Sequence, residues 1–187
     1  MLIFYFILLV ILIIIIFLFS SPKLSPIPYF PSQLVDMPLI IKALNLRSNQ
    51  TMIDLGAGDG IVIFKAAKSS YQQKLNTKFV AVEINPVLIL ILHLRRLFHP
   101  NRRNIKIIYA NIFTMNYNNL VNFTNFKNFI TVYLYISPWY LETTINNLKL
   151  KIKNFNVVSY MYPIKGIIKK EKIIKGKNKI FVYSSDS

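Results

Sequence analysis

The feature that most constrains this fold is a glycine-rich turn at residues 54–60, which reads Asp-Leu-Gly-Ala-Gly-Asp-Gly. It lies between a short apolar run at 51–53 and a stretch of helical composition at 61–68. Glycines let backbone amides approach a ligand closely, because no side chain intervenes and positive φ values cost little. A strand, a glycine turn and a helix in this order favour an α/β fold that binds a nucleotide-like ligand at the turn.

An acidic residue follows about one βαβ unit later, at the end of the apolar run 79–82. Glu83 stands where a carboxylate can accept hydrogen bonds from both hydroxyls of a ribose. The glycines follow Gly-x-Gly-x-Gly, whereas NAD-binding turns follow Gly-x-Gly-x-x-Gly, and Ile61 takes the place of the third NAD glycine. Together the two motifs predict an adenosine-containing cofactor. A tight turn in another α/β fold is the alternative.

From residue 51 onward, apolar runs alternate with helical stretches. The expected strands are 51–55, 78–83, 104–109 and 129–136, and the expected helices are 60–69, 86–98 and 139–151. This alternation predicts a doubly wound, mainly parallel sheet. The last three expected strands, 156–162, 166–175 and 179–184, have no helix between them. They predict a C-terminal antiparallel hairpin at one edge of the sheet.

The first twenty residues have a different character from the rest. Residues 2–19 are an unbroken apolar run, which as a helix would span about 27 Å, close to the hydrocarbon core of a bilayer. We therefore expect residues 1–20 to be a single transmembrane anchor. A cleaved signal peptide is the alternative, but no basic residue precedes the run and Phe-Ser-Ser-Pro at 19–22 is a poor cleavage site.

Every Lys and Arg follows the apolar run, beginning at Lys23. The positive-inside rule then predicts a single-pass protein with its domain on the cytoplasmic side, or on the matrix side of an organelle. The net charge of +16 suits an anionic lipid surface, and it also suits RNA, although an AT-rich genome would enrich Lys as well. With no cysteine and two histidines, the sequence predicts no metal site.

Between the apolar run and the α/β part lies a segment rich in proline and serine. We assign 21–35 to a linker in which residues 28–32 would cover the cofactor, with a plain linker as the alternative, and 36–187 to the catalytic domain. Prolines 22, 26, 28 and 31 disfavour a helix here and keep the segment short and stiff. Asp36 is expected to cap a helix whose first turn contains Pro38.

Seven stretches, in order along the chain, resemble the class I S-adenosylmethionine-dependent methyltransferases. They are the apolar anchor, Pro-Tyr-Phe-Pro-Ser at 28–32, Ile-Asp-Leu-Gly-Ala-Gly-Asp-Gly at 53–60, Ala-Val-Glu-Ile-Asn-Pro at 81–86, Asn-Ile-Phe at 111–113, Val-Tyr-Leu-Tyr at 132–135 and Val-Val-Ser-Tyr-Met-Tyr-Pro at 157–163. Within that superfamily they look like the small membrane-anchored branch. This branch includes the mitochondrial lysine methyltransferases of the ATP synthase c-subunit and the adenine nucleotide carrier, with bacterial relatives.

The resemblance implies S-adenosylmethionine as cofactor and a set of residues that bind it. These residues are Asp54, Gly56, Ala57, Gly58, Asp59, Gly60, Glu83, Ile84, Asn111 and Ile112. Asp54 would face the ammonium group of the cofactor, directly or through water. Glu83 would hold its ribose, or else cap the helix that follows residues 85–86. Asp59 would either bind the cofactor or cap the helix after Gly60. Asn111 stands where the family often has an acid for the adenine amino group.

For the substrate, the resemblance points to Ser137, Pro138 and Trp139 after the fourth strand. Trp139 would form an apolar wall for an alkylammonium stem, or else belong to the core. Family analogy implies N-methylation of a lysine in a membrane protein. A lipid, another hydrophobic small molecule and RNA are alternative substrates, and a non-catalytic cofactor-binding module is the alternative to an enzyme.

Overall fold

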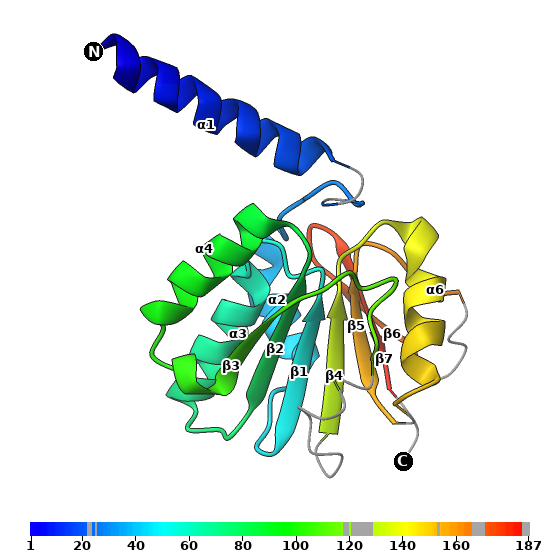
Figure 1. The fold of residues 1–187 in the computed structure, drawn as a ribbon. Helices are drawn as coiled ribbons and strands as arrows, with labels where there is room; N and C mark the ends of the chain where they lie inside the picture. The colour runs from blue at the N-terminus through cyan, green and yellow to red at the C-terminus, as the bar shows by residue number, and fades with distance from the viewer. Residues whose placement is uncertain are drawn as a thin grey trace.

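The described residues form a seven-stranded sheet (Figure 1), in a computed structural model that describes residues 1–21, 24, 26–117, 120, 129–152, 154–165 and 171–184. The strands are β1 (Gln50–Leu55), β2 (Lys78–Glu83), β3 (Ile105–Tyr109), β4 (Phe129–Leu134), β5 (Asn156–Tyr160), β6 (Glu171–Lys175) and β7 (Lys179–Tyr183). They run in the order β3-β2-β1-β4-β5-β7-β6. The first five in that order pair in parallel, whereas β7 is antiparallel to β5 and β6. This confirms the predicted mainly parallel α/β fold with its C-terminal hairpin.

Helices cover both faces of the sheet (Figure 1). The helices of the described residues are α1 (Leu2–Ser20), η1 (Leu34–Asp36), α2 (Met37–Leu44), α3 (Ile61–Gln72), α4 (Pro86–Leu97), η2 (Arg102–Asn104) and α6 (Pro138–Lys149), of which α1 does not cover the sheet. One core cluster joins α2, α3 and α4 to the sheet, and a second cluster joins α6 to the opposite face. In β1 the neighbours Met52 and Ile53 belong to different clusters, because successive side chains of a strand point to opposite faces.

The register of the central strands brings three strand ends to one edge of the sheet. All six residues of β1 are buried, as expected for a strand covered on both faces. Asp54 is paired with Ala81 on one side and with Tyr133 on the other. The carboxyl ends of β1, β2 and β4 therefore meet, and this is where ligands bind in open α/β sheets.

Several element boundaries differ from the prediction by one or two residues. The fifth strand ends at Tyr160 rather than at 162, because Met161 adopts φ +70°, outside the β region. The helix after the glycine turn begins at Ile61, since Gly60 has φ +78°. The fourth strand ends at Leu134, two residues early. Of the predicted strand 166–175, residues 166–170 lie outside the described residues.

Asp36 does not cap a helix with its side chain, although it immediately precedes α2. Its carboxylate accepts hydrogen bonds from the Tyr160 hydroxyl (2.7 Å), from the backbone amides of Lys177 (2.7 Å) and Asn178 (2.9 Å), and from Asn178 Nδ2 (3.2 Å). With φ −87° and ψ −7°, its backbone lacks the extended conformation typical of a capping residue. Asp36 instead fastens the turn between β6 and β7 to the start of α2.

We expect Asp36→Asn to lower the free energy of unfolding by about 1–3 kcal/mol at pH 7, because an amide leaves buried donors unpaired. Burial raises the pKa of Asp36, but the bonds from Tyr160, Asn178 and Lys177 outweigh it and the net pKa is lowered. A lowered pKa stabilises the fold above the ordinary value, and this contribution disappears as the pH falls through the lowered pKa. Urea unfolding of the full chain in detergent should therefore show the deficit at pH 7 and little of it in acid. Tyr160→Phe, which removes one donor, should cost less, and equal stability of Asp36→Asn and wild type at pH 7 would contradict the assignment.

The N-terminal helix α1 stands apart from the sheet. None of its residues is buried, and it is long and apolar enough to cross a membrane. It projects from the carboxyl edge of the sheet (Figure 1). Its last turn contacts the start of α4, where Asn85 Nδ2 donates to the Leu18 carbonyl at 3.2 Å.

Candidate functional site

The glycine turn follows β1 and is tied to β2 by its backbone. Gly56 and Ala57 both donate to the Val82 carbonyl at 2.9 Å. Gly56 and Gly58 adopt φ +81° and +58°, which glycine accepts at little cost. The turn therefore holds its amides at the carboxyl edge of the sheet, as the sequence predicts.

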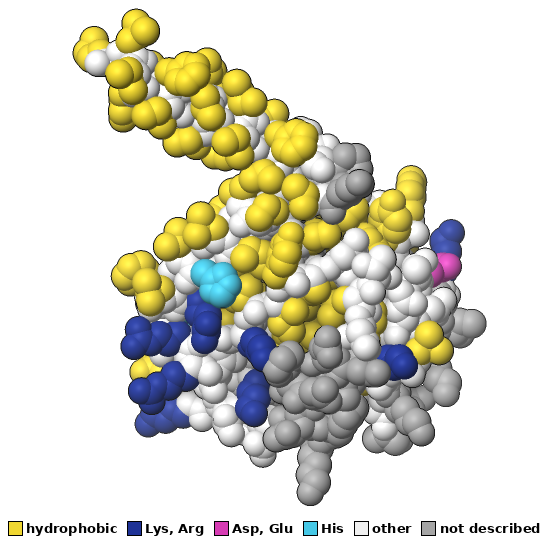
Figure 2. Space-filling model, viewed as in Figure 1, with side chains coloured by type: hydrophobic (Ala, Val, Ile, Leu, Met, Phe, Trp, Pro, Cys, Tyr) yellow, Lys and Arg dark blue, Asp and Glu magenta, His cyan; other side chains and the backbone are white. Residues whose placement is uncertain are grey.

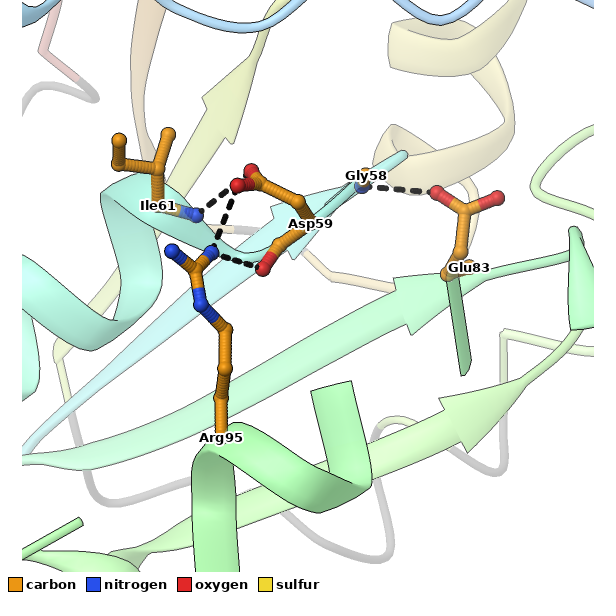
Figure 3. Close-up of polar contacts among 5 residues, drawn as sticks. All are labelled: Gly58, Asp59, Ile61, Glu83 and Arg95. Atoms are coloured by element: carbon orange, nitrogen blue, oxygen red, sulfur yellow. Dashed lines mark hydrogen bonds and ion pairs between the residues drawn. The ribbon is translucent and has the colours of Figure 1, made fainter. Parts of the chain in front are cut away.

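Asp59 caps the helix that follows the turn. Its Oδ1 accepts from the Ile61 amide at 3.1 Å, and its Oδ2 pairs with Arg95 Nη1 at 2.7 Å (Figure 3). Arg95 comes from α4, so the ion pair links α3 to α4 beside the turn. The structure thus shows Asp59 in contact with the start of the helix; because Asp59 also lines the pocket described below, its role in cofactor binding stays a prediction.

Glu83 lies at the end of β2 with its carboxylate held by three backbone amides. Oε2 accepts from Gly58 at 2.8 Å (Figure 3). Oε1 accepts from Ile84 at 2.8 Å and from Asn85 at 2.9 Å. A carboxylate has about four acceptor positions, so one remains for a ligand. Glu83 does not cap α4, because Asn85 Oδ1 takes that role by accepting from Val87 at 2.9 Å and Leu88 at 3.3 Å.

Asp54 is the buried acid at the end of β1. Burial, followed by the nearby carboxylates Glu83 and Asp59, raises its pKa to about 8. None of the hydrogen bonds among the described residues ends on its carboxyl group. A cation at this position would favour the ionised form and lower the pKa again. Asp54 therefore suits a positively charged group of a ligand.

The segment 26–32 covers the turn and helps enclose a pocket of about 750 Å³, part of which is open to solvent. The Ser32 hydroxyl lies 2.8 Å from the Tyr133 hydroxyl of β4, which fastens the segment to the sheet. The pocket is lined by Pro26, Ile27, Pro28, Tyr29, Phe30, Pro31, Ser32, Asp54, Gly56, Ala57, Gly58, Asp59, Ile61, Val62, Glu83, Ile84, Leu88, Ala110, Asn111, Ile112, Phe113, Tyr133, Tyr135 and Ile136. Acidic groups stand at the sheet edge, and mostly apolar groups form the remaining walls.

Tyr29 makes the closest approach of this segment to the turn. A Cβ built on Gly58 would lie 2.6 Å from Tyr29 Cε2, so only glycine fits below the ring. Burial and the neighbouring Asp59 raise the pKa of Tyr29 to about 12, and its hydroxyl is neutral at physiological pH. The ring therefore packs over the turn without adding charge to the pocket.

We expect Gly58→Ala to cost about 1–2 kcal/mol of stability through its positive φ alone. The new methyl group would also push the Tyr29 ring from its place and deform the pocket. Thermal unfolding of single and double variants measures both terms. In the Gly58→Ala background, Tyr29→Ala should restore part of the lost stability. In the wild-type background, the same substitution should not increase stability. Independent, additive effects of the two substitutions would show that the ring does not pack on the turn.

Nine of the ten predicted cofactor residues line this pocket, and Gly60 does not. A Cβ on Gly60 would collide with Leu92 and Phe64, so this glycine serves the packing of α4 on α3. Asn111 Oδ1 accepts from the Phe113 amide at 2.9 Å and shapes the turn after β3. That bond leaves the oxygen with one further acceptor position.

Ser137, Pro138 and Trp139 do not line the pocket. Trp139 is 73% exposed, so the alternative that placed it in the core is wrong. It neighbours Tyr140, whose ring centroid lies 4.7 Å from that of Phe113, and Phe113 belongs to the pocket wall. The three residues therefore stand outside the pocket, next to its rim.

Sequence reasoning missed Tyr133 in β4, Tyr135 just after it, and the Arg95 contact. Tyr133 and Tyr135 line the pocket, and the parallel register that pairs Tyr133 with Asp54 could have indicated it. No local signal pairs Arg95 with Asp59, because the two are 36 residues apart. In the part of the chain that the structure describes, no group of three His, Cys, Asp or Glu side chains could hold a metal ion.

Comparison with known proteins shows likeness at the level of fold. No protein-family model matches the chain, and no curated protein matches its sequence significantly. An RNA methyltransferase from Salinibacter ruber, solved with S-adenosylhomocysteine, superposes with a TM-score of 0.66 at 15% identity, over 83% of this chain and 93% of its own. The precorrin-6y C5,15-methyltransferase of Geobacter metallireducens superposes with a TM-score of 0.58 at 14% identity, over 85% of this chain and 94% of its own. An S-adenosylmethionine-dependent methyltransferase from Geobacter sulfurreducens superposes with a TM-score of 0.52 at 13% identity, over 82% of this chain and 59% of its own. The chain therefore has the Rossmann-like fold of class I methyltransferases.

Proposed function

We propose that this protein binds S-adenosylmethionine and is a methyltransferase that α1 anchors in a membrane. The observation that carries the proposal is the pocket at the carboxyl edge, where Asp54, Gly58 and Glu83 converge under the segment 26–32. Several proteins of this fold were crystallised with S-adenosylhomocysteine, the product of methyl transfer. Their likeness supports the same class of ligand here.

The residues present fit this cofactor. Asp54 would hold the ammonium group of its methionine part, and Glu83 would accept from a ribose hydroxyl at its remaining acceptor position. The amides of the turn approach the ligand because Gly56 and Gly58 carry no side chain. Asn111, with Ile84 and Ile112, would receive the adenine. S-adenosylmethionine, when bound, supplies a methyl group on a sulfonium, which is a good leaving group.

The task left to the chain is to position and desolvate the acceptor. Well-oriented reactants can lower a barrier by roughly 7–11 kcal/mol. A lysine acceptor must also lose a proton, which costs about 4–5 kcal/mol at pH 7 from an ordinary pKa of about 10.4. A pocket lined largely by apolar groups disfavours the ammonium form and reduces that cost. Glu142 is exposed on α6 and does not line the pocket, so we assign it no role as a base.

We propose the lysine of a membrane protein as the substrate. Two observations support this choice: the apolar helix α1 and the exposed aromatic residues Phe30 and Trp139, one in the pocket wall and one beside it. They would place the pocket within reach of a segment that emerges from the bilayer. RNA is the second candidate, and the net charge of +16 is the observation that favours it.

Methyl transfer from radiolabelled S-adenosylmethionine tests both candidates. Membranes that contain the full chain would be incubated with the label, then separated into protein, lipid extract and RNA. We expect label in protein and, after acid hydrolysis, in methylated lysine. Label in the lipid extract or in RNA would overturn lysine as the substrate but would support methyltransferase activity. If a folded sample neither incorporates label nor binds S-adenosylmethionine, the proposal that this protein is a methyltransferase is overturned.

A further inference from the structure

Helix α4 is apolar on two opposite faces. Leu88 and Leu92 point into the domain and are buried. Leu90, Leu94 and Leu97 form a second stripe on the outer side, with exposed fractions of 59%, 52% and 55%. At 3.6 residues per turn, positions 88 and 90 lie about 200° apart around the helix, so the two stripes face away from each other. Only the inner stripe is buried against the rest of the domain.

The outer stripe is a row of neighbouring exposed leucines, not a set of single exposed residues scattered over the surface. Its members are spaced i, i+4 and i+7, which places them on one helix face, and Phe98 follows with 83% of its side chain exposed. A contiguous apolar patch of this kind marks a contact with a protein or a membrane. Figure 2 shows hydrophobic side chains gathered over α4 and the adjacent end of the domain, on the side where α1 leaves it.

The position of α1 identifies what covers the stripe. Its last turn meets the first turn of α4 through the bond between Asn85 and the Leu18 carbonyl. The outer stripe therefore starts at the point where an uncharged, 19-residue apolar helix leaves the domain. The part of the chain after α1 carries all 23 Lys and Arg residues, which favours contact with an anionic surface. Helices with an apolar stripe lie in the membrane interface in this way.

We propose that the outer face of α4 lies in the interfacial layer of the membrane that α1 crosses. The inference rests on the anchoring by α1 contained in the proposed function, and it adds a second membrane contact that fixes the orientation of the domain. With α1 and α4 both in contact with the lipid, the carboxyl edge of the sheet, with its pocket, is held next to the bilayer. An acceptor group near the membrane surface then reaches the pocket without the domain tumbling away.

The chain contains no cysteine, so a single introduced cysteine can be labelled without background. The test uses the full chain at one copy per lipid nanodisc, with phosphatidylcholine and a minority of phosphatidylglycerol. A nitrobenzoxadiazole dye is attached to Leu94→Cys or Leu90→Cys. Ile11→Cys, in the middle of α1, reports on the anchor. Lys68→Cys, on the exposed side of α3, is the water-facing control.

We expect the dye on Leu94→Cys and Leu90→Cys to lose most of its intensity to nitroxide-labelled lipid and little to iodide. The dye on Lys68→Cys should behave in the opposite way. Dye in lipid at Ile11→Cys but in water at Leu94→Cys would overturn the contact of α4 and leave the anchor intact. Dye in water at both sites would overturn the anchor and, with it, this inference. Shielding from iodide without quenching by lipid, at one copy per nanodisc, would mean that protein covers the stripe, and it would also overturn the proposal.

Discussion

Glu83→Ala is expected to weaken the binding of S-adenosylmethionine by about 10- to 100-fold. The remaining acceptor position of Glu83 can take one hydrogen bond from a ligand hydroxyl, and the loss of such a bond to a carboxylate costs about 1.5–3 kcal/mol. The substitution also releases the amides of Gly58, Ile84 and Asn85 and loosens the turn. Calorimetric titration of the detergent-solubilised full chain with S-adenosylmethionine, S-adenosylhomocysteine and NAD measures the effect. Wild type should bind the first two ligands and not NAD.

Two controls separate loss of the ligand contact from loss of structure. Glu142→Ala removes an exposed carboxylate of α6 and should bind as wild type does. Glu83→Gln keeps the volume and one acceptor oxygen, so its binding should fall between wild type and Glu83→Ala. Wild-type affinity in a folded Glu83→Ala variant would exclude Glu83 from the ligand site.

The second large effect is a pH dependence that originates at Asp54. Its pKa of about 8 means that the carboxyl is mostly protonated at pH 7 when the pocket is empty. A bound ammonium group favours the carboxylate, so binding must release a proton below the raised pKa. Affinity should therefore rise by up to about tenfold per pH unit from pH 6 and level off near pH 8. Titrations in buffers of different ionisation enthalpy measure the proton release directly.

Asp54→Asn should abolish this pH dependence and weaken binding at all pH values. It should also stabilise the empty protein above pH 8. Because the pKa of Asp54 is raised in the folded state, its protonation contributes fully to stability below the unfolded value of 3.8. This contribution is lost as the pH rises through about 8. Wild type should thus lose a few kcal/mol between pH 5 and pH 9, since each pKa unit corresponds to about 1.4 kcal/mol, whereas Asp54→Asn should not. A wild type with flat affinity and no proton release between pH 6 and 8 would contradict the assignment of Asp54.

The central sheet and the core of the site were predictable because local pattern and topology agree there. Long apolar runs form the buried parallel strands, and parallel strands bring their carboxyl ends to one edge. Asp54 and Glu83, which end adjacent strands, therefore had to lie close together. The glycines at 56 and 58 belong to a turn that no other residue type fits well, and the structure gives both a positive φ.

The remaining features depend on contacts between distant parts of the chain. Asp36 bonds to Asn178 across 142 residues, and no local pattern encodes that partner. The same holds for Tyr29 over Gly58 and for Arg95 beside Asp59. Trp139 is different, because α6 buries Leu141, Ile145 and Leu148. That periodicity places position 139 on the outer side of the helix, so its exposure could have been predicted.

The segment 26–32 has a mechanical consequence. It forms one wall of the pocket through Tyr29 and Phe30, and it also lies in the stretch of chain between the domain and α1. The Ser32–Tyr133 contact fastens this wall to the sheet, so any displacement of the wall from the pocket has to break that contact. A force that moves the domain away from α1 is transmitted along this same chain. We therefore expect a change in the distance between α1 and the domain to change the shape of the pocket.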